Sequence, residues 1–407
     1  MDRQSVRTDR LAVDGGQPTR TTPFPAWPVA DEREERLLLE VLHSGKWGEL
    51  SGDKVTTFAA RFAAFQGAKY GVCVPNGTMA LEMGLRALGV GPGDEVITTS
   101  YTFIATASAA LSLGAKPVFV DIDPRTGNID PEKIAAAVTP RTKAIVPVHF
   151  GGQPADLDGV VVVAQRHGLR VLEDAAQAWG AEWQGRRVGA IGNAGTFSFQ
   201  MSKNMTAGEG GIVVTDDDAL NDLCWSLHNV GRVREGAWYQ HEILGWNFRM
   251  TEWAGAVLLA QLERLPEQMP VREASAQYLD GALAEIPGIS PLETDRRVTR
   301  HARHLYPIRY DATRFGNHPR AAFIAAMHAE GVPCISAGYV PLTQSPAIHR
   351  ALHDLFGPDS VAGIAPCPLA DEAGEQVLWI YQNALLGDRE DMESIATAME
   401  KIQAAWR

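Results

Sequence analysis

One lysine of this sequence lies in an unusual loop. Lys203 sits in GTFSFQMSKNMTAGEGG (195–211), a polar stretch bounded by glycines between two runs of β-forming residues. An amine that acts as a nucleophile must be positioned and partly desolvated. Most lysines are solvated surface groups, and the tight turns implied by the GEGG run distinguish this one. The loop makes Lys203 a candidate for forming an imine.

An acidic residue and an amide precede the lysine by about thirty residues. In VLEDAAQAWGA (171–181), Glu173 and Asp174 follow an apolar run, where a buried carboxylate needs a partner. At the ligand-binding edge of a parallel sheet, Asp174 could pair with a protonated nitrogen in the ring of a ligand, and Gln177 could reach a neighbouring oxygen of the same ring. The alternative is an ordinary helix N-cap.

A turn near the first predicted strand can hold an anion. In VPNGTMALEMGLRALG (74–89), Asn76-Gly77-Thr78 connects a strand to a helix. The free N–H groups and positive dipole end of that helix suit a phosphate, and Thr78 adds a hydroxyl. The alternative is again a simple helix cap.

These three signals match the requirements of one cofactor. Pyridoxal phosphate (PLP) needs an anion cradle, an acid beside its pyridine nitrogen and an amine for its aldehyde. The same lysine, once released, can move a proton as general base and acid. No GxGxxG fingerprint follows the first strand, which disfavours a nicotinamide cofactor.

The elements that position these residues alternate between strand and helix. Helical patterns at 78–89 and 106–114 separate several short β-rich runs, which predicts a mostly parallel sheet covered on both faces. The last two runs have no helix between them, so some antiparallel pairing is expected. The predicted strands are 70–74, 95–99, 116–122, 143–150, 170–175, 194–199 and 211–216.

The rest of the chain predicts an arm, further helices and a second domain. Residues 1–30 are polar and proline-containing and read as an extended N-terminal arm, and 31–45 as an amphipathic helix. We expect a large PLP-binding domain over 31–265 and a small α+β C-terminal domain over 266–407. Helices are predicted at 251–265, 269–286, 319–331 and 390–406, and a strand at 304–311.

Composition narrows the class of protein. The 407 residues carry a net charge of −12, which argues against binding to nucleic acid or to a membrane surface. No apolar run is long enough to span a bilayer. The cysteines form no CxxC pair, so we expect buried free thiols, no metal site and a cytoplasmic location. The four are Cys73, Cys224, Cys334 and Cys367.

From about Gly15 to its end, the sequence resembles the DegT/DnrJ/EryC1/StrS family of sugar aminotransferases. The resemblance implies a fold-type-I PLP-transferase, α/β, working as a homodimer. It rests on the motifs NGTMALE, SYTFIAT, GAKPVFVDID, PRTKAIVPVHFGG, VLEDAAQAWGA, TFSFQMSKNMTAGEGG and NFRMTEWAGA.

The family pattern, transferred onto matching positions, assigns a role to each candidate site residue. It gives Lys203 as the Schiff-base lysine and Asp174 as the partner of the pyridine nitrogen. The other cofactor contacts implied are Gln177 at the ring hydroxyl, Gly77, Thr78 and Ser198 at the phosphate, Phe103 stacked on the ring, and Asn247 at the phosphate of the neighbouring subunit.

Several of these positions have a purely structural alternative. Phe103 could be a core residue, Ser198 an inward strand hydroxyl and Asn247 a helix cap. His149 of PVHFGG has no assigned role, and a structural histidine is an equal alternative.

Two segments bear on the substrate. Gly338-Tyr339 stands where many nucleotide-sugar members carry a histidine-tyrosine pair, and LWIYQNALLG (378–387) also departs from their pattern. Both look closer to the scyllo-inosose aminotransferase branch, which implies glutamine or glutamate as donor and a keto-cyclitol or keto-sugar as acceptor. A nucleotide-sugar aminotransferase and a dehydratase or lyase of the same family are the alternatives, and a non-catalytic homologue is disfavoured.

Overall fold

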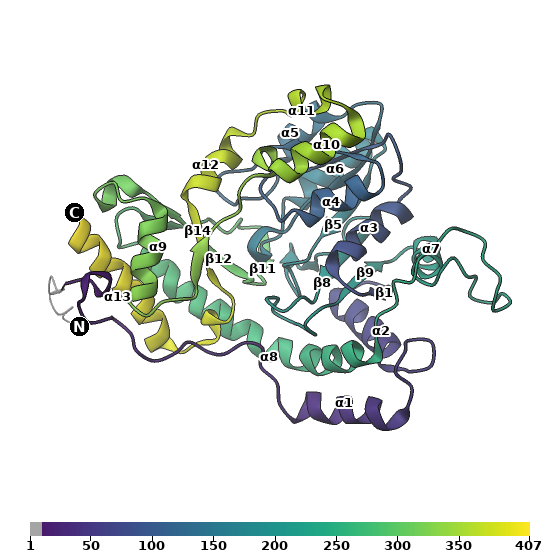
Figure 1. The fold of residues 1–407 in the computed structure, drawn as a ribbon, viewed down its shortest axis with the longest axis horizontal. Helices are drawn as coiled ribbons and strands as arrows, with labels where there is room; N and C mark the ends of the chain where they lie inside the picture. The colour runs from purple at the N-terminus through teal and green to yellow at the C-terminus, as the bar shows by residue number, and fades with distance from the viewer. Residues whose placement is uncertain (1–9) are drawn as a thin grey trace.

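The structure, a computed structural model, describes residues 10–407 of the chain (Figure 1). Its centre is a seven-stranded sheet with the order β1-β9-β8-β5-β4-β2-β3. Neighbouring strands are parallel except where β9 pairs antiparallel with β8 and with β1, as expected for the last two runs. The strands are β1 Tyr70–Val74, β2 Glu95–Thr99, β3 Lys116–Val120, β4 Thr142–Val146, β5 Arg170–Asp174, β8 Ala194–Ser198 and β9 Gly211–Thr215.

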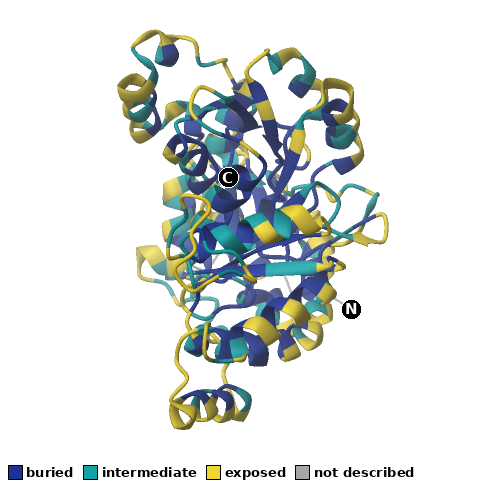
Figure 2. Cartoon of the chain, turned by 90° about the vertical axis from the view of Figure 1, so that its right-hand side faces the viewer, coloured by how far each residue is buried: buried dark blue, intermediate teal, exposed yellow. Residues whose placement is uncertain are grey.

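Helices cover both faces of this sheet, as the predicted alternation requires. Side chains of neighbouring strand positions point to opposite faces. Phe197 and Ile212 therefore pack with α1, α2 and α8, whereas Val213 packs with α3 and α7. Figure 2 shows the buried interior between these layers. The helices are α1 Glu32–Ser44, α2 Lys54–Gln66, α3 Gly77–Ala87, α4 Ala105–Ser112, α5 Pro131–Ala137, α6 Leu157–His167, α7 Asp218–His228 and α8 Glu252–Leu283.

A second, antiparallel sheet follows in the C-terminal part, with the order β10-β12-β14-β13. The end of α8 contributes Leu279 and Leu283 to the apolar core that this sheet shares with α9 and α13. The elements are β10 Ile289–Pro291, β12 Leu305–Tyr310, α9 Arg320–Ala329, β13 Ile335–Ala337, α10 Pro346–Phe356, α11 Asp359–Ala362, α12 Pro368–Gln376, β14 Val377–Tyr381 and α13 Arg389–Trp406.

The long helix α8 joins the two parts (Figure 1). The sequence predicts two helical segments, 251–265 and 269–286, but the structure has one continuous helix that contains Pro266 and Pro270. Each proline removes one backbone donor, and packing on both sides maintains the helix through them. The predicted division at 265/266 falls inside this helix, and the division into domains stays a prediction.

A small third sheet also links the two parts, because β11 (Val298–Arg300) pairs with β6 (Glu182–Trp183), which pairs with β7 (Arg186–Arg187). Strands of two or three residues carry almost no periodic signal, and the sequence predicts none of them.

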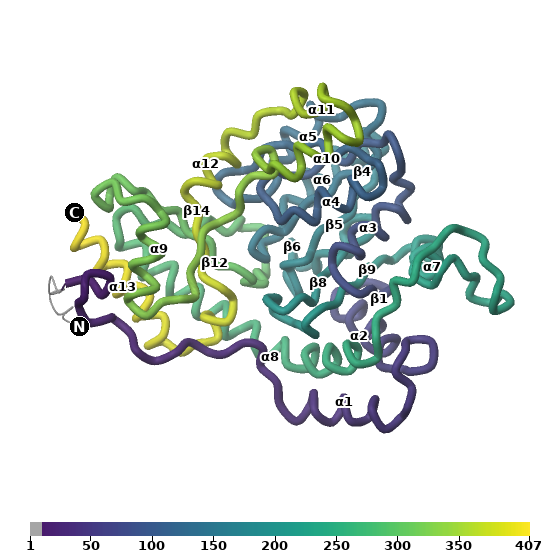
Figure 3. The backbone as a smooth tube through the Cα atoms, viewed as in Figure 1, coloured from purple at the N-terminus to yellow at the C-terminus, as the bar shows by residue number. Residues whose placement is uncertain are grey.

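The arm before α1 is extended, as expected, and is anchored along its course (Figure 3). Glu330 accepts hydrogen bonds from the backbone of Ala12 and Thr19 at 2.8 and 2.9 Å. Further along, the indole of Trp27 donates to the carbonyl of Met201 at 2.8 Å. The arm therefore runs from the C-terminal part to the loop that carries Lys203; its residues before 10 lie outside the described range.

The structure also bears on membrane spans and on the state of the cysteines. No helix within residues 10–407 is long and apolar enough to cross a membrane. The four cysteines are buried and unpaired, as the sequence predicts.

A buried ion pair fixes α1 to α8 and generates a first prediction. Arg264 donates to both oxygens of Glu34 at 2.6 and 2.8 Å, and both side chains are nearly inaccessible. Arg264→Met leaves a buried carboxylate without its cation and should destabilise the protein by about 3–5 kcal/mol, measured as a lowered melting temperature. Arg36→Met, which breaks the exposed pair Arg36–Glu40, is the matched control and should change little. Equal effects of the two substitutions would contradict this assignment.

Candidate active site

The strands that carry the predicted site residues end at one edge of the central sheet. β1, β5 and β8 run in the same direction, so their carboxyl ends lie together. Ligands of open α/β sheets bind at this edge. β9 starts there as well, because Gly211 is the register partner of both Val74 and Ser198. The loop that carries Lys203 connects β8 to β9 and therefore lies at the same edge.

The predicted anion cradle is built by close backbone packing. A β-carbon on Gly77 would lie 2.7 Å from the β-carbon of Ser198, and one on Gly211 would lie 2.4 Å from the carbonyl oxygen of Asn76. Both positions thus require glycine. The Asn76 side chain caps α3 by accepting from Met79 N at 2.9 Å, which leaves the first amides of the helix for a ligand. Thr78 is exposed at this helix start. Gly77 therefore packs on Ser198, and Thr78 follows Gly77 in the first turn of α3.

Asp174 is the last residue of β5, and it is buried, with only 4% of its surface accessible. The hydroxyl of Thr106 donates to Oδ2 at 2.8 Å, and the backbone of Ala176 donates to Oδ1 at 3.2 Å. Burial raises the pKa of Asp174, while these two bonds and the charge of Lys203 act in the opposite direction. A cationic N–H group would stabilise this carboxylate further.

Lys203 is half-buried in the loop between β8 and β9. Burial lowers the pKa of its ammonium to about 8, and the negative charge of Asp174 partly opposes this effect. About a tenth of the side chain is therefore a free amine at pH 7, compared with less than about one in a thousand for an ordinary lysine. The predicted lysine and the predicted aspartate act on each other through space.

Gln177 has both ends of its side-chain amide engaged. Its oxygen accepts from Gly151 N at 2.8 Å, and its nitrogen donates to the hydroxyl of Tyr339 at 3.1 Å. The second N–H of the amide remains for a ring oxygen. Tyr339, which the sequence relates only to substrate choice, thus contacts a predicted cofactor residue directly.

His149, to which the sequence assigns no role, has a structural one. Its Nδ1 accepts from Ala155 N at 3.0 Å, so the ring proton lies on Nε2 and is donated to Glu173 at 3.1 Å. Glu173 also accepts from the backbone of Gly189, Ile191 and Gly192 at 2.6, 2.7 and 2.6 Å. Burial opposes the charged form of Glu173, but the His149 bond and the backbone donors outweigh it and lower the pKa.

The remaining two predicted residues are exposed. Phe103 precedes α4, with 56% of its surface accessible, so it is not a core residue; its carbonyl accepts from Thr106 N at 3.3 Å, which places it beside the Asp174 partner. Asn247 pairs with Asn229 in an isolated bridge, on the loop that projects beyond α7. Within residues 10–407, no hydrogen bond or strand pairing joins Asn247 to Lys203 or Asp174 of its own chain.

Thr106 is a site residue that sequence reasoning missed. It belongs to the first turn of α4 (Ala105–Ser112) and is bonded to the hydroxyl of Thr102 at 3.2 Å as well as to Asp174. The signal was a hydroxyl three residues after Phe103 in SYTFIAT. That signal could be interpreted only once β5 and α4 were known to be adjacent.

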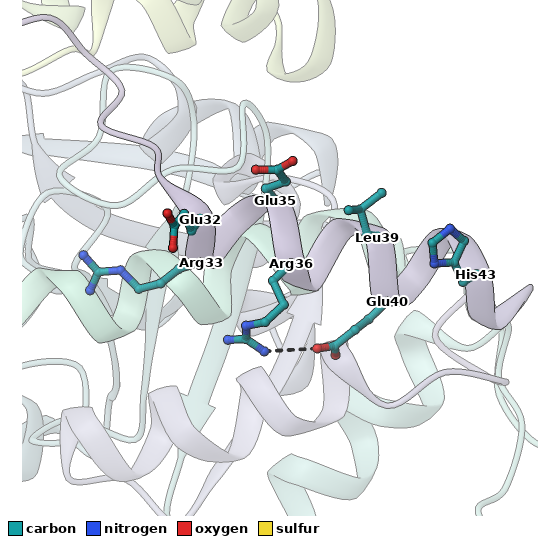
Figure 4. Close-up of a pocket in the computed structure, with 7 residues that line it drawn as sticks. All are labelled: Glu32, Arg33, Glu35, Arg36, Leu39, Glu40 and His43. Atoms are coloured by element: carbon teal, nitrogen blue, oxygen red, sulfur yellow. Dashed lines mark hydrogen bonds and ion pairs between the residues drawn. The ribbon is translucent and has the colours of Figure 1, made fainter.

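A pocket elsewhere on the surface has no part in this chemistry. Figure 4 shows the side chains that line a hollow along α1. All of them come from one helix, and none is a predicted site residue. They are Glu32, Arg33, Glu35, Arg36, Leu39, Glu40 and His43.

Known proteins resemble this chain over nearly its whole length. It is 40% identical over 418 residues to L-glutamine:2-deoxy-scyllo-inosose aminotransferase of Micromonospora echinospora, covering 98% of both chains. It is 41% identical over 379 residues to 3-amino-5-hydroxybenzoate synthase of Amycolatopsis mediterranei, covering 92% of this chain and 95% of the relative. A crystal structure of 3-amino-5-hydroxybenzoic acid synthase superimposes with a TM-score of 0.87 at 38% identity, covering 95% of this chain and 100% of the other.

The fold of these neighbours confirms the α/β fold-type-I expectation, and the cofactor of this enzyme is PLP. The family model of the DegT/DnrJ/EryC1/StrS aminotransferases matches residues 28–400. The chain therefore belongs to the DegT/DnrJ/EryC1/StrS aminotransferase family.

Proposed function

We propose that this enzyme moves the amino group of glutamine, or of glutamate, onto the ketone carbon of a keto-cyclitol such as a scyllo-inosose. The pairing of Lys203, with its lowered pKa, and the buried carboxylate of Asp174 at one sheet edge carries the transamination chemistry. The name of the Micromonospora relative supports glutamine and a deoxy-inosose as the substrates. A keto-sugar is the alternative acceptor.

The residues present fit PLP. Gly77 and Gly211 let the start of α3 pack closely on the end of β8 and the start of β9, so the first amides of α3 lie at the sheet edge where a phosphate can accept from them. Within residues 10–407 the buried Asp174 accepts only from neutral donors, and a pyridinium would supply a cationic one. We assign Gly77, Thr78 and Ser198 to the phosphate, Gln177 to the ring oxygen and Phe103 to the ring face. The assignments rest on the geometry of the sheet edge together with the family pattern.

The chain's own groups then have distinct tasks. When bound, PLP supplies a carbonyl carbon that carries the amino group and a ring that accepts electrons as the donor's Cα–H proton leaves. Asp174, held by Thr106 and Ala176, keeps a negative charge at the ring nitrogen. Lys203 takes the Cα–H proton of the donor and gives a proton to the former ketone carbon of the acceptor, because an amine with a pKa of about 8 can both bind and release a proton near neutral pH.

A second copy of the chain is proposed to complete the site. The loop after α7 projects from the body and exposes Trp238, Tyr239 and Leu244 at 58%, 82% and 79%. Leu39 and Leu42 are exposed on α1, whose outer side Figure 4 draws. Apolar side chains gathered on projecting elements indicate an interface. We propose a homodimer in which Asn247 reaches the phosphate site of the partner.

We also propose that the enzyme works in the cytoplasm. Four buried, unpaired cysteines suit a reducing compartment.

The alternative with a specific observation in its favour is a dehydratase or lyase. The Amycolatopsis relative is named as a synthase of an aromatic product and is 41% identical. Elimination would begin with the same proton removal by Lys203, and the products distinguish the two reactions.

A donor and acceptor panel tests the proposed function. The enzyme with PLP bound is mixed with glutamine, glutamate or alanine and then with keto-cyclitols or keto-sugars. The products are identified by mass spectrometry. We expect an absorbance change with glutamine and an acceptor that exchanges its ketone oxygen for an amine.

Lys203→Ala should lose activity by at least about 10³-fold. Lys143→Ala, at an exposed lysine of β4 near the opposite edge of the sheet, should not. Turnover by Lys203→Ala, or loss of water in place of the nitrogen gained, would contradict the proposal.

The lowered pKa of Lys203 predicts the pH dependence of cofactor uptake. Only the free amine attacks an aldehyde, and it is the minor form below its pKa of about 8. The association rate of PLP with the apoenzyme should therefore rise about tenfold per pH unit below this value and level off above it. Stopped-flow absorbance measures the rate. A midpoint near that of an ordinary lysine would show that the amine is not desolvated.

Mixed dimers test the shared site. Lys203→Ala and Asn247→Ala chains are co-expressed with different tags and the hybrid is purified. If Asn247 serves its partner, one site of each hybrid is intact and about half the wild-type activity returns per hybrid dimer. Lys203→Ala mixed with Asp174→Asn is the control, since both residues serve their own site and no activity should return. No recovery in the first hybrid would place Asn247 in its own chain's site, and an Asn247→Ala homodimer as active as the wild type would place it outside any site.

A further inference from the structure

The chain crosses between its two main parts through residues 301–304, HARH, which connect β11 to β12. Two backbone bonds hold this segment against the sheet edge of the active site. Ala302 N donates to the carbonyl of Gly152 at 3.0 Å, and His304 N donates to that of Gly151 at 2.9 Å. Gly151 also donates to Gln177, so the crossing segment adjoins a cofactor residue.

Arg303 holds this segment in a strained conformation. Its φ is +51°, in the left-handed region that residues with a β-carbon seldom adopt. An ion pair with Glu273 at 2.9 Å and a bond from its N–H to His301 Nδ1 at 2.9 Å maintain it. Strain of this kind persists only where surrounding contacts enforce it, and it is common near functional sites. The residue that follows is His304.

His304 contacts the residue next to the lysine. Its Nδ1 lies 3.0 Å from Oδ1 of Asn204, and Nδ2 of Asn204 donates to the carbonyl of Ala302 at 2.8 Å. Because the amide nitrogen is used in that bond, Oδ1 must accept, so the imidazole carries its proton on Nδ1. The ring also packs edge-on against Trp179, with centroids 5.6 Å apart. Both His304 and Trp179 are buried.

The imidazole is held neutral. Burial lowers the pKa of His304 well below its usual range, and the charges of Lys203 and Arg272 lower it further. A neutral ring can fix the loop without adding a second positive charge beside the lysine amine.

We propose that His304 is a positioning residue for Lys203, which acts through its hydrogen bond to Asn204 to hold the lysine-bearing loop against the crossing segment. The loop between β8 and β9 has no ladder of its own at this point, and the His304–Asn204 bond ties it to the second part of the chain. The proposal rests on the proposed function, since it concerns the lysine that this function uses.

The test compares two substitutions that differ in one group. His304→Phe keeps a ring against Trp179 and removes the N–H donor, whereas His304→Asn keeps a donor near the place of Nδ1. We expect His304→Phe to lower kcat by about 10- to 100-fold while KM for the donor changes less than about threefold. The loosened loop admits water to Lys203, so the pH midpoint of PLP association by the apoenzyme should rise by about half a unit or more. His304→Asn should recover most of both effects.

Two further variants keep the test decisive. His301→Asn is the matched control on the same segment, because an asparagine can still accept from Arg303 N, and it should keep kcat and the midpoint of the wild type. Asn204→Ala removes the same bond from the other side and serves if His304→Phe does not fold. The double variant should be no worse than the worse single one.

The outcomes separate this proposal from the proposed function. A wild-type chain that takes up no PLP overturns both. A wild type that titrates near its expected midpoint, with kcat and midpoint unmoved in His304→Phe or in Asn204→Ala, overturns the role of His304 alone. Effects of the two single variants that multiply in the double variant also overturn it.

Discussion

The buried carboxylate of Asp174 is the constraint on which the site depends. Taking an anion out of water is costly unless hydrogen bonds and a cation compensate. Thr106 and Ala176 supply two neutral donors, and within residues 10–407 no cation donates a hydrogen bond to this carboxylate. Lys203 acts on it only through space. The free protein therefore holds an acid that a pyridinium N–H would stabilise, beside an amine that burial has made reactive.

The preceding residue shows the opposite arrangement on the same strand. Glu173 and Asp174 point to opposite sides of β5, since neighbouring strand positions alternate. Glu173 receives three backbone N–H groups and the imidazole of His149, so its charge is fully compensated. These bonds fix the loop before β8 and thereby the start of this strand, which ends at Ser198. One acid stabilises the fold, and its neighbour is left for the cofactor.

Local sequence patterns predicted most of the fold. The seven predicted strands correspond to those of the central sheet, and the helix predicted from Asp31 to Gly45 is α1, capped by Asp31. Short β-rich runs between helical periods are local signals, so they survive without knowledge of the rest of the chain. The continuous α8 was not predicted, because prolines within a helix indicate a break and only its packing on both parts overrides them.

Contacts between distant residues were beyond the reach of these patterns. Lys203, Asp174 and Gly77 could be proposed as site residues because each lies in a motif of the family pattern, whereas their local sequences alone left a helix cap as the alternative for Asp174 and Gly77. Thr106 is an ordinary helix residue until β5 lies beside it. The position of Asn247 relative to a second chain stays a prediction for the same reason.

The geometry of the lysine loop is a property of the whole chain rather than of the sheet. Between β8 and β9 the backbone forms local turns, such as that from Lys203 N to the carbonyl of Gln200 at 2.9 Å, and two distant segments hold this loop as well. Trp27 of the N-terminal arm bonds to Met201, and His304 of the crossing segment bonds to Asn204, on either side of Lys203. Neither segment belongs to the central sheet. The arm and the C-terminal part therefore add contacts on both sides of Lys203 that the strand ends of the sheet do not supply.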